Sequence, residues 1–160
     1  MSDESGRARK PGSNVRHQAR RAVVQALYQW QATNQDPGFI VRQFLEDRSL
    51  QRFDKKLFKE LFEGTIAERE ALDELLGPLL DRPLDQVDPV ERGVLRLAGY
   101  ELKHRLEIPL RVVINEAVEL AKTFGAESGH RFVNGVLDQL ADQVRPEAAA
   151  VKSARKTTPP

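Results

Sequence analysis

The sequence predicts an all-α protein, and two observations carry the prediction. Apolar residues recur at helical spacing along most of the chain, and Gly and Pro stand at intervals that separate helices. No segment shows the sustained alternation of β-branched and polar residues that marks a strand. With 160 residues, the chain is long enough for one domain, or for two small subdomains that share a core.

Six helices and one short helical turn are expected, about seven helical elements in all. The periodic segments place helices at about 14–33, 38–47, 53–77, 89–105, 109–124 and 129–144, with the turn at 83–87. Short loops between them predict neighbours that pack antiparallel or at moderate crossing angles. The two ends lack apolar periodicity, so residues 1–13 are expected to form a disordered basic arm and residues 146–160 a disordered tail.

The first helix begins with an unusual concentration of positive charge. Three arginines and a histidine fall between Arg16 and Arg21, and the segment from Ser5 to Gln35 contains no Asp or Glu. Cations at a helix N-terminus oppose the macrodipole and each costs about 0.3–1 kcal/mol, so helix stability does not explain them. Binding to a nucleic-acid backbone would explain these cations, because each phosphate that they neutralise releases counterions. The alternative is a solubilising end whose cations pair with acids elsewhere.

The later helices have clearer boundaries. Asp88 can cap a helix whose first position suits Pro89, and Glu91 lies three residues after the cap, as in a capping box. Pro109 opens the next helix in a similar way, and Gly125 ends it where a left-handed residue is expected. These signals predict two consecutive helices, at about 89–105 and 109–124.

Glu101 falls inside the apolar arc of its helix. A carboxylate in that position must find a partner, because an unpaired buried charge is costly. The favoured explanation is a structural partner within the core, either an arginine or an amide such as Asn115. A functional role for Glu101 is the alternative.

The sequence offers no catalytic or metal-binding set. The histidines at 17, 104 and 130 lie on three different predicted helices without metal-ligand spacing, and the chain has no Cys. The segment FGAESGHR follows a helix and lacks the ending of a phosphate-binding loop. We therefore expect no enzyme, no metal and no cofactor. No apolar run approaches a membrane span and no secretory signal is visible, so a cytoplasmic protein is expected.

Four blocks of sequence resemble the NusB family of bacterial transcription antitermination factors. The blocks are RRAVVQALYQWQ, ERGVLRLAGYEL, IPLRVVINEAVELAKTFGAE and HRFVNGVLDQL, and the resemblance runs from about Asn14 to Pro146. It implies two small helical bundles packed across each other, with subdomains at about 14–80 and 81–145. It also implies a non-enzymatic protein that binds a short, single-stranded, U-rich RNA element called boxA. NusE, a small-subunit ribosomal protein, binds with it, and the complex joins NusA, NusG and RNA polymerase during ribosomal RNA transcription.

The resemblance also implies site residues. The RNA contacts carried over from the family are Arg16, His17, Arg20, Arg21, Ser128, Arg131 and Phe132. Tyr28 and Glu91 fall where the family contacts its ribosomal-protein partner. Independently, helical periodicity places Phe132 at the edge of its core stripe, where its ring either stacks on an unpaired base or borders the core.

Three alternatives stay open at this point. The basic helix face could be buried in a homodimer. The chain could be an RNA-binding module related to that of ribosomal RNA cytosine methyltransferases, although it ends before a methyltransferase domain would begin. It could also be a helical scaffold whose partner is only protein.

Overall fold

The computed structural model describes residues 12–148, and this part of the chain consists of helices and connecting loops. The α-helices are α1 Ser13–Thr33, α2 Pro37–Glu46, α3 Lys55–Ala67, α4 Arg69–Leu76, α5 Pro89–His104, α6 Leu110–Phe124 and α7 Gly129–Val144, and two short 3-10 helices are η1 Gly77–Leu79 and η2 Leu84–Gln86. The all-α prediction is confirmed. Most of the predicted arm lies outside the described residues, as does the predicted tail from residue 149. Residues 146–148 are helical in this structure.

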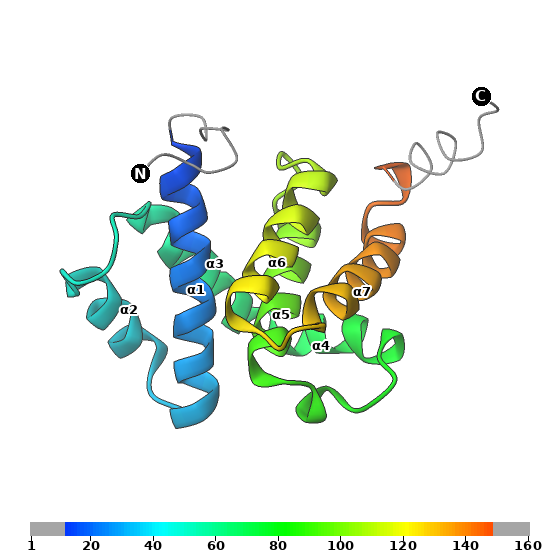
Figure 1. Cartoon of the computed structure of the whole chain (residues 1–160), viewed down its shortest axis with the longest axis horizontal. Helices are drawn as coiled ribbons and strands as arrows, with labels where there is room; N and C mark the ends of the chain where they lie inside the picture. The colour runs from blue at the N-terminus through cyan, green and yellow to red at the C-terminus, as the bar shows by residue number, and fades with distance from the viewer. Residues whose placement is uncertain (1–11, 149–160) are drawn as a thin grey trace.

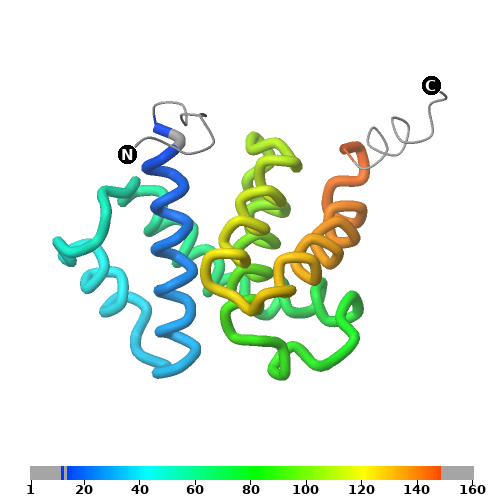
Figure 2. Tube along the Cα trace, in the orientation of Figure 1, coloured from blue at the N-terminus to red at the C-terminus, as the bar shows by residue number. Residues whose placement is uncertain are grey.

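The helices form two groups that pack across each other, as expected. Helices α1, α2 and α3 lie together, and α4 to α7 form the second group (Figure 1). Helix α5 joins the groups, because it packs against α1 and α3 as well as α4, α6 and α7. One continuous apolar core runs through both groups. The trace in Figure 2 shows that α1 begins and α7 ends at the same end of the molecule.

The prediction of one helix at 53–77 is wrong, because the chain turns at Glu68 between α3 and α4. Both helices pack on α5, but α3 also packs on α1, whereas α4 also packs on α7. Oε1 of Glu68 lies 3.1 Å from Nε2 of His104 and 3.7 Å from Nζ of Lys103, so the turn between α3 and α4 contacts the end of α5.

The predicted start of α5 is confirmed, but the end of α6 differs from expectation. Oδ1 of Asp88 accepts hydrogen bonds from the backbone N–H groups of Val90 and Glu91, at 2.9 and 3.2 Å, and Pro89 occupies the first turn. Gly125 is extended, with φ −94° and ψ −175°, and is not left-handed. Glycine is favoured there for a steric reason, since a Cβ would stand 2.8 Å from the carbonyl oxygen of Ala121.

Arg145 follows α7 directly and connects the end of this helix to the end of α5. Its guanidinium donates to the carbonyl oxygens of Leu102, Ile108 and Arg105, at 2.8, 2.6 and 2.9 Å, and to that of Glu101 at 3.2 Å. A cation at this position satisfies the carbonyls that a helix leaves without partners. Burial lowers the pKa of Arg145 from its ordinary value, and the charges of nearby acids oppose that change.

Candidate nucleic-acid interface

The arginine-rich start of α1 does not form one exposed surface. Arg16 is exposed, but only 4% of Arg20 and 9% of His17 are accessible. Arg20 donates through Nε and a terminal nitrogen to the carboxylate of Glu101 on α5, at 2.9 and 2.8 Å. Nδ1 of His17 lies 2.8 Å from Oε1 of Glu116 on α6. Arg20 and His17 are therefore buried and connect α1 to α5 and α6, and their assignment to RNA stays a prediction.

The buried partner expected for Glu101 is confirmed, and it is Arg20. Both side chains are almost fully enclosed, and the two parallel hydrogen bonds match the planar fork of the guanidinium. Burial by itself would lower the pKa of Arg20, but the hydrogen bonds and charge of Glu101, with the charge of Glu116, raise it above its ordinary value. For Arg20, the alternative in which the cations pair with acids elsewhere is the one that the structure supports.

Arg21 connects the start of α1 to the end of α6. Its guanidinium carbon stands 5.2 Å from the centre of the Phe124 ring, and the side chain is half-buried. A cation over an aromatic face is attracted to the ring and is held in a defined place. Beside it, a hollow of about 200 Å³ between α1 and the α2–α3 loop is lined by the amides of Gln18, Gln25 and Gln51.

The turn between α6 and α7 presents the remaining predicted RNA contacts. Ser128 and Arg131 are exposed, and Phe132 is half-buried with its ring packed against the core. A side chain that sequence reasoning missed stands over that ring, because the guanidinium carbon of Arg82 is 5.2 Å from its centre. Nε of Arg82 donates to Asp81 at 2.9 Å. No local pattern links residues fifty positions apart, so only the folded chain reveals this contact.

Glu91 lies beneath the same turn, although a partner contact would place it at the surface. It is 6% exposed, and its carboxylate accepts a hydrogen bond from the backbone N–H of Ala126. Gly129 makes room for it, since a Cβ at that position would stand 1.9 Å from Oε2 of Glu91. Glu91 is therefore buried in this structure, and its assignment to the partner stays a prediction. Its observed role is to support the turn that carries Ser128.

Stability should depend on the protonation of Glu91. Burial, followed by the negative charge of Asp88, raises the pKa of the Glu91 carboxyl. A carboxyl with a raised pKa in the folded state binds its proton more tightly there, so it stabilises the fold at low pH and this contribution is lost as the pH rises through the folded pKa. Glu91→Gln keeps an oxygen that accepts from Ala126 but cannot ionise. We expect this variant to gain stability relative to the wild type between about pH 4 and about pH 7.

Urea denaturation of both proteins at the two pH values measures that difference. If Glu91→Gln and the wild type differ in unfolding free energy by the same amount at both pH values, ionisation of Glu91 does not destabilise the fold.

Tyr28, the second residue assigned to the partner, has the exposure that this role requires. It is 48% exposed on α1, seven residues beyond Arg21. Its neighbour one turn on, Gln31, donates to the carbonyl oxygen of Pro89 at 3.0 Å and accepts from Arg96 at the same distance. The end of α1 that carries Tyr28 is thus held against α5.

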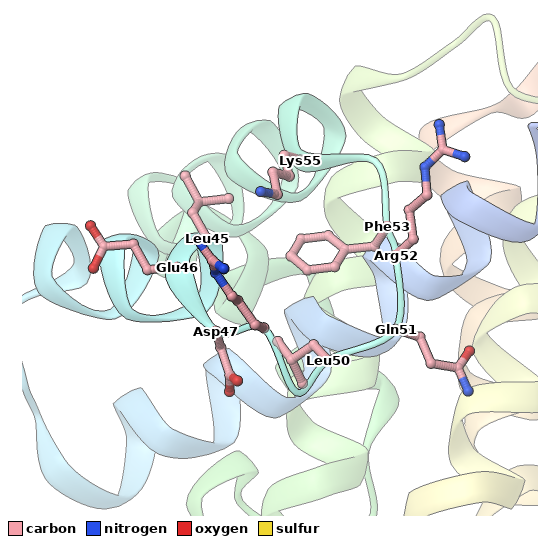
Figure 3. Close-up of a pocket in the computed structure, with 9 residues that line it drawn as sticks. Leu45, Glu46, Asp47, Leu50, Gln51, Arg52, Phe53 and Lys55 are labelled. Atoms are coloured by element: carbon pink, nitrogen blue, oxygen red, sulfur yellow. The ribbon is translucent and has the colours of Figure 1, made fainter.

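A larger hollow, of about 480 Å³, lies at the α2–α3 loop (Figure 3). Its charged lining is mixed, with Arg48, Arg52 and Lys55 beside Glu46 and Asp47. None of the predicted site residues lines it, so it is separate from the surface around the α6–α7 turn. Within residues 12–148, no cluster of His, Asp and Glu is suited to hold a metal ion. The same part of the chain contains no helix with the length and apolarity of a membrane span.

Comparisons with known proteins agree on one family. The model of the NusB family matches residues 17–142. The transcription antitermination protein NusB of Shewanella amazonensis is 53% identical over 125 residues, which cover 78% of this chain and 93% of that protein. The solved structure of T. maritima NusB superposes with a TM-score of 0.74 at 32% identity, covering 82% of this chain and 94% of that one. A crystal structure of NusB and NusE in complex with double-stranded RNA gives a TM-score of 0.72 at 27% identity, covering 81% and 98%.

Proposed function

Because the chain belongs to the NusB family, we propose that it binds boxA-type single-stranded RNA together with NusE, as part of transcription antitermination. Its relatives are antitermination proteins and not enzymes, so the role is non-catalytic. In this proposal NusA, NusG and RNA polymerase complete the assembly, ribosomal RNA is the transcript that it serves, and the cytoplasm is where it acts.

The contact between Arg21 and Phe124 is the observation that supports RNA binding most directly. The resemblance assigns RNA to two segments far apart in sequence, the start of α1 and the α6–α7 turn. The guanidinium of Arg21 stands over the last residue of α6, so these segments share one surface. A single strand of RNA could therefore contact both segments at once.

The proposed contacts divide into surface and supporting residues. Arg16, Arg21 and Arg131 supply positive charge at the surface, where guanidinium groups pair with phosphates and stack on bases. Ser128 offers an exposed hydroxyl in the turn. The other assigned residues act through the fold: Arg20 and His17 fix the start of α1, Glu91 supports the turn, and Phe132 packs beneath Arg82.

Removing the two surface arginines of α1 should weaken RNA binding and its salt dependence. For Arg16→Ala/Arg21→Ala, the slope of log affinity against log salt should become less steep by up to about 1.4, since each phosphate contact on single strands contributes about 0.7. Gel-shift titrations with a U-rich boxA RNA at several salt concentrations measure this slope. Arg42→Ala, which removes an exposed cation from α2, is the matched control and should leave the slope unchanged.

The same titrations separate the alternatives. If the wild type binds no RNA at low salt, with or without NusE, the RNA proposal is wrong and a protein-only scaffold is favoured. Stronger binding to duplex than to single-stranded RNA would contradict the boxA part of the proposal. Sedimentation with and without RNA tests the homodimer, which should dissociate on binding if it hides the basic face.

A further inference from the structure

We propose that Arg82 forms a nucleobase-binding site, in which an RNA base stacks on the outer face of its guanidinium and Phe132 is the platform beneath. The inference rests on the proposed RNA-binding function and extends it to a loop that the sequence did not assign to RNA. It also changes the expected role of Phe132, whose ring supports the stacking group and does not itself meet the base.

The geometry leaves Phe132 without a free face for a base. Its ring packs against the core, and the guanidinium carbon of Arg82 stands over it at 5.2 Å from the ring centre. A base could reach the ring only by displacing Arg82. The Arg82 side chain itself is 44% exposed, so its outer face is open to solvent. Guanidinium planes stack on aromatic systems, so in this proposal Phe132, Arg82 and the base lie in series.

The neighbouring carboxylate favours a base over a phosphate at this position. Asp81 holds Nε of Arg82 at 2.9 Å, and its own side chain is 75% exposed. An exposed negative charge beside the guanidinium would repel a phosphate. A base carries no net charge, so Asp81 does not oppose it. The bond to Nε also holds the guanidinium in place, and its planar face stays available for a base.

The same arrangement occurs on the other side of the α6–α7 turn. There, the guanidinium of Arg21 stands 5.2 Å from the ring centre of Phe124. Phe124 is the last residue of α6, and Phe132 lies in the first turns of α7. Two guanidinium groups held on phenyl rings therefore flank the turn, and exposed Ser128 and Arg131 lie between the two rings in sequence. Paired stacking platforms suit consecutive unpaired bases of a single strand.

The test places 2-aminopurine at each position of a boxA RNA in turn, because stacking quenches its fluorescence. With the wild type, we expect quenching at one position to depend on Arg82. Arg82→Ala should abolish that quenching and weaken binding roughly 5- to 150-fold, the range found for losing one stacked base. Arg82→Lys keeps the charge but lacks the plane, so it should lose the quenching while the salt dependence changes little.

A double-mutant cycle tests the platform. Phe132→Leu keeps an apolar side chain on the core but removes the ring, and it should also reduce the quenching. If ring and guanidinium act as one unit, Arg82→Ala/Phe132→Leu should bind RNA no more weakly than the worse single variant. Arg69→Lys is the matched control, because Arg69 stands over Trp30 in a similar way, with its guanidinium carbon 5.3 Å from that ring. It should retain the quenching.

The outcomes separate this inference from the proposed function. A wild type that binds no RNA overturns both. A wild type that binds, with affinity and quenching unchanged in Arg82→Ala and Arg82→Lys, overturns the inference alone. Stronger quenching in Arg82→Ala also overturns it, because the base would then stack on the Phe132 ring itself. Thermal unfolding followed by circular dichroism should show all Arg82 variants folded, since Arg82 lies in an exposed loop.

Discussion

Glu101→Ala should lower the free energy of unfolding by about 3–5 kcal/mol, because it leaves the guanidinium of Arg20 buried without its partner. Arg20 is 4% exposed and makes both of its short hydrogen bonds to Glu101. Glu116, whose Oε1 lies 4.0 Å from the other terminal nitrogen of Arg20, is shared with His17 and can replace only part of the lost interaction. Urea denaturation of the variant and the wild type measures the loss.

The control removes both charges together. Arg20→Met/Glu101→Leu fills the same space with apolar side chains and should recover most of the stability, since a buried ion pair often contributes little beyond its apolar replacement. A single variant within about 1 kcal/mol of the wild type would contradict the prediction. The double variant also tests the role of Arg20 in RNA binding. If Arg20 acts only through the fold, the double variant should bind boxA RNA as the wild type does.

Much of the fold follows from local signals in the sequence. The start of α5 is set by Asp88 and Pro89, which act on the residues next to them, and the sequence located it correctly. The need of Glu101 for a partner was also predictable, because the energy of a buried charge does not depend on which residue satisfies it. Its partner on α1 is 81 positions away, and sequence spacing cannot identify a residue at that distance.

The parts that sequence reasoning missed depend on how distant helices pack. The break at Glu68 lets α3 pack on α1 and α4 pack on α7 while both contact α5, whereas their apolar periodicity is that of one helix. Glu91 turns inward because Gly129, from a different helix, leaves space for its carboxylate. His17, Arg20 and Glu91, which the resemblance assigned to ligands, are buried for the same reason, because only the packed structure shows which side chains reach the surface.

Tyr28→Ala should weaken binding to NusE by roughly 30-fold or more, as expected when an aromatic contact residue at the centre of an interface is truncated. Tyr28 is the most exposed aromatic side chain among those assigned to the site, at 48%. It lies about 10 Å along α1 from Arg21, given a rise of about 1.5 Å per residue over seven residues. Calorimetric titration of the variant with purified NusE measures the change.

The decisive comparison is between partner binding and RNA binding. Leu106→Ala is the control, because this exposed residue lies in the α5–α6 loop. Figure 1 shows that loop at the end of the molecule where α1 begins. It should leave NusE binding unchanged. Tyr28→Ala should leave the affinity of the isolated protein for boxA RNA close to that of the wild type, since the arginines at the start of α1 are intact. Equal losses for RNA and NusE would mean that both ligands share the Tyr28 surface, and the division of α1 into an RNA end and a partner end would then be wrong.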